Sequence, residues 1–180
     1  MGSFNTFGRT EKSYGTGKNI WHLVENKYPV GGKVSNLSDF PVGTVIPSGS
    51  MSIFDSVKGE TKVLKGIADF SATKTYKLNE KVIHDGVAYK CSTAVSSAGA
   101  WTGDTNWTAL EAGDADYDDF VNVNGLLEND IYVDEAAKST NGCATATVVY
   151  KGLIYSSRLE HSIPDIVWNN LTEIKQFKEA

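Results

Sequence analysis

The sequence predicts a mainly β fold that carries a smaller β module inside a larger β-rich domain. Short apolar runs separated by turn residues recur from Phe40 onward. The stretch 76–110 is rich in aromatic residues and has a hairpin signal of its own. Apolar residues at helical spacing are found only near the C-terminus, after Ser162. We therefore expect β-sheet throughout, one C-terminal helix and an extended N-terminal arm.

The expected arm covers residues 1–39. Its first half is rich in Gly, Ser, Thr and Asn, which is typical of extended chain. An apolar cluster then precedes Pro29, and it consists of Ile20, Trp21, Leu23, Val24 and Tyr28. One interpretation is a short helix on the protein's own core. The other is an arm that orders against a second subunit, because so apolar a segment needs a surface to cover it.

The β-rich domain is expected to be discontinuous, formed by residues 40–66 and 113–180. Two strand-like runs flank Pro47–Gly49, which predicts a hairpin, and a further strand is expected at Lys62–Leu64. A second hairpin is expected around Asn124 and Gly125, within 120–133. The strongest strand signal lies at 144–156.

The C-terminal segment changes period. Ser162 can cap a helix whose first turn contains Pro164, and a short strand is expected at Ile174–Phe177. Upstream, Asp114, Asp116 and Asp118 have the spacing of the first calcium-loop ligands. Later positions of that motif do not fit, so a solvated acidic linker is the better interpretation.

The inserted module is expected at residues 67–112. Asp85 and Gly86 lie between the strand-like runs KVIH and VAYKC, where they supply the positive φ angles of a two-residue turn. A unit of about forty residues has a marginal core unless aromatic side chains supply most of the buried area. The large apolar residues available for that core are Tyr76, Val82, Tyr89, Trp101 and Trp107.

Composition and motifs exclude several classes of function. The net charge of −5 argues against a general nucleic-acid surface, and no apolar run approaches membrane-spanning length. The histidines His22, His84 and His161 lie in different expected elements, without a nearby nucleophile or metal-ligand spacing, and His84 is interpreted as an exposed turn residue. We expect no enzyme, no metal and no cofactor. The start of the chain has no signal-peptide core, which predicts assembly in a cytoplasm.

The order Tyr76, Val82, Asp85-Gly86, Tyr89, Trp101, Asn106-Trp107 and Leu110 resembles the small chitin- and cellulose-binding modules, copies of which recur in phage fibre and head proteins. The resemblance implies that Trp107 is the buried closing Trp. It leaves Trp101, together with Tyr89, as the glycan-stacking candidates. Those modules usually follow the second-strand Tyr with exposed tryptophans, whereas Lys90 follows Tyr89 here. A Trp101 exposed on a flat face favours sugar binding, and a Trp101 buried beside Trp107 excludes it.

The flanking segments resemble tailed-phage head fibre and capsid decoration proteins. The resemblance is carried by PVGTVIPSGSMSIFD, NVNGLLENDIYV, ATATVVYKGLIYSSRL and IPDIVWNNL. It implies a structural virion protein on the capsid exterior, assembled in the host cytoplasm, which stabilises the shell and projects the module outward. The implied partners are the major capsid protein and further copies of the chain in a trimer. Ile20, Trp21, Leu23, Val24 and Tyr28 are then the capsid-contact candidates. The alternative is adhesion to a host-surface glycan through exposed aromatics.

Overall fold

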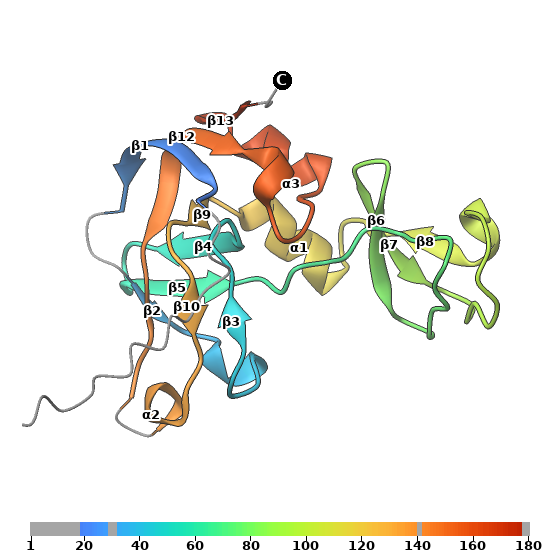
Figure 1. Cartoon of the computed structure of the whole chain (residues 1–180), viewed down its shortest axis with the longest axis horizontal. Coiled ribbons are helices and arrows are strands. Elements are labelled where there is room, and N and C mark those ends of the chain that lie inside the picture. The colour runs from blue at the N-terminus through green and yellow to red at the C-terminus, as the bar shows by residue number, and fades with distance from the viewer. Residues whose placement is uncertain (1–18, 29–31, 140–141, 178–180) are drawn as a thin grey trace, which may run out of the picture.

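The computed structural model describes residues 19–28, 32–139 and 142–177, and within them the protein is mainly β, as predicted (Figure 1). A larger part, called the body, contains the described residues of 19–66 and 113–177. The module, residues 67–112, stands beside it. The chain leaves the body after one strand, β5 (Glu60–Val63), and re-enters it at a helix, α1 (Ala115–Asn122).

An eight-stranded sheet forms the framework of the body. Its order is β1 (Trp21–Lys27), β12 (Val148–Tyr155), β9 (Gly125–Leu127), β4 (Met51–Asp55), β5, β2 (Gly32–Val34) and β11 (Thr145–Ala146), and β13 (Ile174–Phe177) pairs in parallel with β12. The long strand β12 is built from β-branched and aromatic residues, which favour strands. A glycine is required at position 152 of this strand, because β1 lies so close there that a Cβ would overlap the backbone carbonyl of Leu23.

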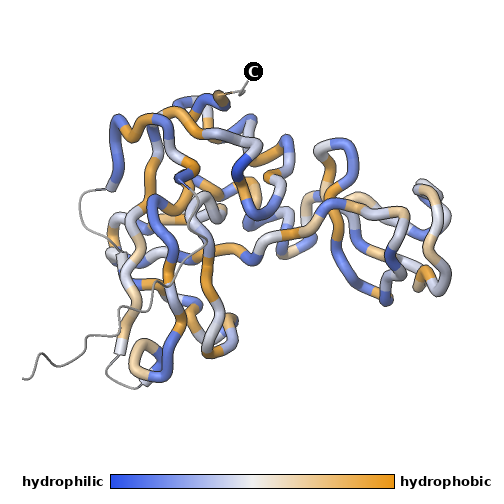
Figure 2. Tube along the Cα trace, viewed as in Figure 1, coloured by the Kyte–Doolittle hydropathy of each residue, from blue (hydrophilic) through white to orange (hydrophobic). Residues whose placement is uncertain are grey.

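Both faces of the central part of this sheet are covered, so β9 and parts of β4 and β12 are apolar on both sides, whereas the edge strands β1 and β13 are largely exposed. Met51 and Leu126 face one core cluster, whereas their strand neighbours on the other face, such as Val63 and Leu127, belong to a second. The strand segments are accordingly the most hydrophobic parts of the body, and polar residues concentrate in the connections (Figure 2). Two helices, α1 and α3 (Asp165–Asn170), and one side of the module also pack on the first cluster.

The segment expected as an arm is part of this sheet. From position 21 the chain forms β1, which pairs antiparallel with β12, and Ile20 and Trp21 are buried in the body's own core. The indole Nε1 of Trp21 donates a hydrogen bond to the Leu127 carbonyl at 3.2 Å. The expectation of an arm over 1–39, or of a short helix before Pro29, is therefore wrong for residues 20–28 and 32–39. Residues 1–18 and 29–31 lie outside the described residues.

The hairpin expected around Pro47–Gly49 is also wrong. A turn is present, with Ser50 N donating to the Pro47 carbonyl at 3.2 Å. However, β3 (Val45–Ile46) pairs with β10 (Ile131–Tyr132), and β4 pairs with β5 and β9. The side chain of Asp130 accepts from Ser48 N at 2.6 Å, and this distant contact directs the turn toward strands far away in sequence.

Two short helices lie at the base of the module. The helix α1 occupies the segment expected as an acidic linker and as the first strand of a hairpin. Its early carboxylates suit the positive end of a helix, and Phe120 anchors it in the core at 2% exposure. It packs against α3, the expected C-terminal helix, and β13 then forms the expected final strand. The predicted start of α3 is wrong: Pro164 is its N-cap residue and not part of its first turn, and Ser162 does not cap it, because Ser162 Oγ donates to Asp69 Oδ2 at 2.7 Å.

The remaining helical segments are short and lie in the body except for one. They are η1 (Leu37–Asp39), η2 (Gly103–Thr105, in the module), α2 (Glu135–Lys138) and η3 (Ser156–Arg158). The Asp134 side chain caps α2 by accepting from Ala137 N at 2.6 Å. None of the helices within the described ranges is both long enough and apolar enough to cross a membrane.

The module is an antiparallel sheet of three strands, β6 (Lys81–His84), β7 (Val87–Cys91) and β8 (Trp107–Ala109). The predicted turn is present, because Asp85 and Gly86 have φ angles of 48° and 78°. The incoming chain runs parallel to β6, with Phe70 N donating to the Ile83 carbonyl at 2.8 Å. The module thus forms a complete small sheet with its own core cluster.

Candidate functional site

The module sheet has two chemically different faces, because successive side chains of each strand point to opposite sides. The face that meets the body is called the inner face. It carries Ile83, Ala88 and Leu110, which are buried in the core cluster that the module shares with the body. The opposite, outer face carries the aromatic side chains. The inner face therefore attaches the module to the body, and the aromatic residues of the outer face are not covered by the body.

Polar contacts at the edge of the inner face reinforce this docking. Lys81 pairs with Asp116 of α1, and Lys90 Nζ lies 3.3 Å from Asp114 Oδ1. Asp165 N, at the start of α3, donates to the Gly86 carbonyl at 2.8 Å. Because both strand lysines of the module point to the inner face and are paired there, they place no positive charge on the outer face.

The core under the outer face is built from aromatic residues, as predicted. Trp107 is 2% exposed, which confirms the expectation of a buried closing Trp, and its ring lies edge-on to that of Tyr76 with centroids 5.0 Å apart. The Tyr76 hydroxyl accepts from Ser71 N at 2.6 Å and donates to the Ser71 carbonyl at 3.1 Å. This pair of bonds fixes the loop that precedes the strands.

Trp101 lies on top of this core and is half-buried. Its ring is nearly parallel to that of Trp107, at 5.0 Å and 18°, and to that of His84, at 4.1 Å and 28°. Tyr89 meets it edge-on at 4.8 Å. Trp101 is thus neither an isolated flat platform nor a fully buried residue, and it forms one ring of a composite surface with His84 and Tyr89.

Sequence reasoning missed two members of this cluster. His84, interpreted as an exposed turn residue, has a side chain only 28% exposed, because the ring stacks on Trp101. Its position two residues after the buried Val82 is the signal that places it on the same face. Phe70 lies edge-on to Trp101 at 5.0 Å. It precedes the stretch 76–110, and nothing local in the sequence marks it.

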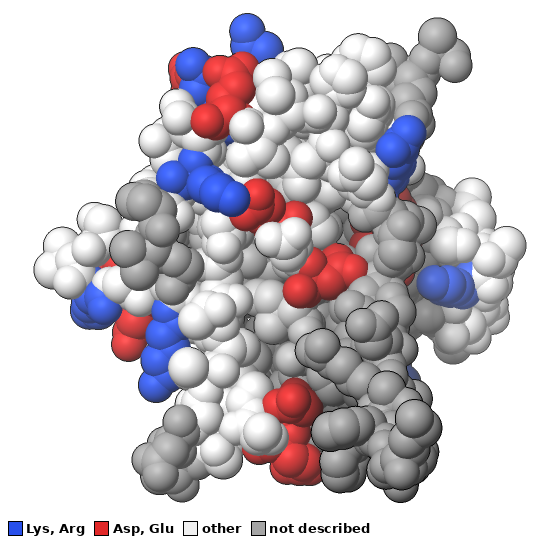
Figure 3. Space-filling view, turned by 60° about the vertical axis from the view of Figure 1, so that its left-hand side comes forward, with Lys and Arg blue, Asp and Glu red and all other residues white. Residues whose placement is uncertain are grey.

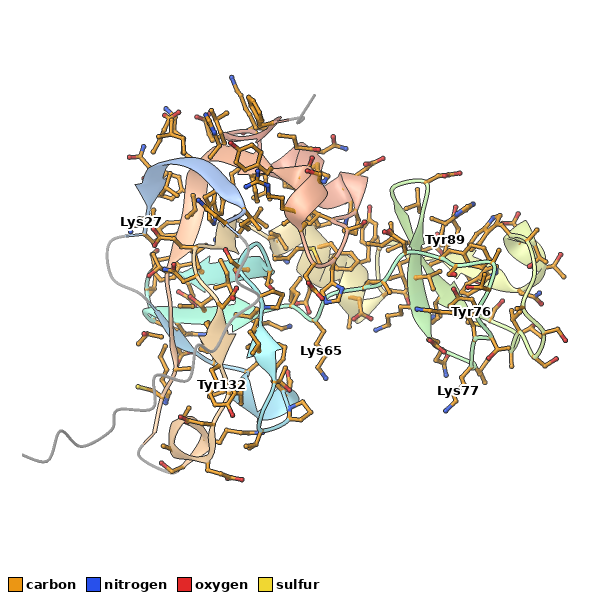
Figure 4. All side chains as sticks on the ribbon, in the orientation of Figure 1. Lys27, Lys65, Tyr76, Lys77, Tyr89 and Tyr132 are labelled. Atoms are coloured by element: carbon orange, nitrogen blue, oxygen red, sulfur yellow. The ribbon has the colours of Figure 1, made fainter. Side chains whose placement is uncertain are left out.

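The exposed part of the ring cluster is formed by the aromatic side chains of Tyr89 and Trp101 and the imidazole of His84. The Asp85 carboxylate lies 3.6 Å from His84 Nε2, and its side chain is 91% exposed. Tyr89 can be followed on the module in Figure 4. Within the described residues, no group of three or more His, Cys, Asp or Glu side chains is arranged to hold a metal ion. The chemistry this face offers is stacking by half-exposed rings.

The capsid-contact candidates are not assembled into one exposed surface. Ile20 and Trp21 are buried, Val24 packs against the body core, and Leu23 alone of the five is strongly exposed, at 46%. Tyr28 is half-buried, with its ring 4.3 Å from that of Phe54. Burial raises the pKa of the Tyr28 hydroxyl, and the neighbouring Tyr150 adds to this effect.

On the face drawn in Figure 3, basic and acidic side chains of the described residues are both scattered among uncharged ones. One of the ion pairs of the body joins Lys27 Nζ to Glu128 Oε1 at 2.8 Å.

Comparison with known proteins finds a similarity for one part of the chain. Residues 69–110 match the family model for carbohydrate-binding module family 5/12. The matched range coincides with the module that the structure separates from the body. Searches of the curated proteins and of the solved structures gave no match to this chain.

Proposed function

We propose that the protein binds a glycan through the outer face of its module and that the body supports and presents this module. The observation that carries the proposal is the coincidence of the family match over residues 69–110 with a half-exposed ring cluster on the side facing away from the body. The apolar side chains of the inner face are buried against the body, so the aromatic rings exposed for stacking on a sugar lie on the outer face.

The mode of binding follows from the chemistry of the rings. Sugar rings have apolar faces of C–H groups, which pack on aromatic side chains, and an uncharged surface selects no acidic substituent. The composite of His84, Tyr89 and Trp101 offers a small contact area, so affinity for one sugar chain is expected to be low. Several copies presented together raise the apparent affinity through effective concentration.

The test is retention of the full-length protein on insoluble chitin and on cellulose. Tyr89→Ala is expected to weaken retention roughly two- to tenfold, the equivalent of about 0.5–1.5 kcal/mol for one aromatic contact. Trp101→Ala is expected to weaken it at least as much. Leu78→Ala is the matched control, since Leu78 is 59% exposed in the module and outside the ring cluster. Near-ultraviolet circular dichroism checks that each module still folds.

Equal retention of Tyr89→Ala, Trp101→Ala and the wild type on both polymers would contradict the proposal. So would a protein that binds neither polymer nor any neutral member of a glycan array when it is displayed in many copies.

A virion role for the body is the second candidate. It rests on the resemblance of the flanking segments to head fibre proteins and on an exposed aromatic surface. In that surface the rings of His22 and Phe177 stack at 5.0 Å, and Tyr155 lies edge-on to both. Leu23 and Phe177 are 46% and 41% exposed. The body then attaches to the major capsid protein through this surface, as a trimer, on the exterior of the particle.

The measurement that tests this role is cosedimentation with purified phage heads. Phe177→Ser and Leu23→Ser should reduce copies per head, and a fully exposed control, Val57→Ser, should not. A protein recovered only in the soluble fraction of infected cells would exclude the virion role while leaving the glycan proposal untouched.

A further inference from the structure

A polar cleft lies where the module joins the body, on a different side of the module from the ring cluster. It has a volume of about 560 Å³. Its lining comes from the end of β5, the connection 64–68, the start of β6 and the inward side of α1. Both the body and the module therefore contribute walls, and a ligand in the cleft touches both parts at once.

Two ion pairs border the cleft, and both end on α1. Lys62 of the body donates to both carboxylate oxygens of Asp119 at 2.6 Å, and Lys81 of the module pairs with Asp116. The two aspartates are separated by three positions, so they lie on the same side of the helix one turn apart. Each pair combines an acceptor with a donor, and the side chains remain 28–44% exposed to the cleft and solvent.

The formal charges around the cleft cancel. The positively charged residues of the lining are Lys62, Lys65 and Lys81, and the negatively charged ones are Asp39, Asp116 and Asp119. Such a site favours neither an anion nor a cation. A hydroxyl group donates and accepts at once, so neighbouring hydroxyls on one ring can bond to the carboxylate and the ammonium of the same ion pair.

Additional hydrogen-bonding capacity comes from the connection itself. Within the described residues, the peptide groups of Lys65, Gly66 and Ile67 have no backbone hydrogen-bond partner. The side chain of Lys65 projects away from the ribbon at this point (Figure 4). The Asn79 side chain, across the cleft, makes no hydrogen bond to a described residue. The apolar floor is formed by Leu64, Ile67 and Phe120.

We propose that this cleft is a second binding site, which takes a neutral saccharide unit by hydrogen bonds from its hydroxyls to the Lys62–Asp119 and Lys81–Asp116 pairs. The site works by polar recognition over an apolar floor, in contrast to stacking on the outer face. It does not require that the outer face binds a glycan. Because its walls belong to both parts, an occupied cleft also ties the module more firmly to the body.

The experiment is a titration of the full-length, isotope-labelled protein followed by backbone amide resonances. The probes are cellotetraose, N-acetylchitotetraose, the anionic tetragalacturonate and an uncharged tetrapeptide. We expect a neutral oligosaccharide to shift the amides of residues 64–68, Asn79 and Lys81, and to do so in Trp101→Ala as well. Asn79→Ala and Lys65→Ala should each weaken this binding roughly two- to tenfold, the effect of losing one hydrogen bond. Lys77→Ala, outside the cleft lining, is the control.

Four results would overturn the proposal. The first two are amide shifts confined to the outer face, and amide shifts at the cleft that Trp101→Ala abolishes. The other two are a response to tetragalacturonate equal to that to the neutral oligosaccharides, and a response to the tetrapeptide stronger than that to the neutral oligosaccharides. Loss of outer-face binding with the cleft response intact would refute the first glycan site and leave this one standing, so the two proposals fail separately.

Discussion

Replacing Gly86 by alanine tests whether the module is docked on α3. Gly86 has a φ of 78°, and a left-handed alanine costs about 1–2 kcal/mol. A Cβ at this position would also overlap the carboxylate of Asp165. Asp165 is exposed, so its carboxylate can rotate away at the cost of an unfavourable rotamer, about 0.5–1.5 kcal/mol. The expected total loss of unfolding free energy is therefore about 1.5–3.5 kcal/mol.

A matched control is available in the same module. Gly103 has a φ of 57°, but no atom lies within 4 Å of a Cβ built there. Gly103→Ala should therefore show only the conformational cost of about 1–2 kcal/mol. Adding Asp165→Ala to Gly86→Ala removes the overlapping carboxylate. The loss of unfolding free energy caused by Gly86→Ala should then fall close to the loss caused by Gly103→Ala.

The assay is urea unfolding of the full chain followed by tryptophan fluorescence. Equal losses for Gly86→Ala and Gly103→Ala, with no recovery on adding Asp165→Ala, would refute the docking of the hairpin turn on α3. The inner face would then have to be held by its apolar contacts alone.

Three further changes have defined outcomes. Thr61→Val should raise the free energy of unfolding by about 1–3 kcal/mol, because Thr61 Oγ1 is buried without a hydrogen-bond partner among the described residues; a lower urea midpoint would contradict this. Trp107→Ala should cost about 3–5 kcal/mol and abolish the near-ultraviolet signal of the ring cluster, with Leu78→Ala nearly neutral in the same measurement. The pKa of Asp114 is lowered by the hydrogen bond from the backbone N–H of Glu111 and then by Lys90. The ionised Asp114 therefore contributes to the free energy of unfolding above the unfolded pKa of about 3.9, and this contribution disappears as pH falls through the lower folded pKa. The stability difference between wild type and Asp114→Asn should accordingly shrink from about pH 4 downward, and a difference that grows on acidification would reverse the assignment.

Local signals in the sequence were sufficient for the module and the C-terminus. The turn at Asp85 and Gly86 depends on two adjacent residues, and α3 depends on Pro164 and the apolar spacing after it. The burial of Trp107 came from the resemblance of residue order to a known module. The turn and the helix are determined by residues close together in the chain, whereas the contacts that bury Trp107, such as that with Tyr76, are more distant and were inferred from the resemblance.

Features fixed by distant contacts were not predictable in this way. Trp21 looked like an arm residue because its partners, Ile154 in the sheet and the Leu127 carbonyl, lie more than a hundred positions away. The segment of α1 has too few apolar residues to indicate a helix, and lysines from two other strands pair with its carboxylates. The orientation of Trp101 depends on rings from β6, β7 and β8 together, so the sequence could name Trp101 and Tyr89 but not the surface they form.

The position of β12 has a consequence for the order in which the chain can fold during synthesis. Trp21 pairs with Ile154, so β1 must wait for nearly the whole chain before it finds its neighbour. The module, by contrast, contains all the strands of its own sheet between Lys81 and Ala109. On the ribosome, the module can therefore acquire its sheet while β1 is still unpaired. Its inner face, with Ile83 and Leu110, then offers an early apolar surface on which α1 and later α3 can settle.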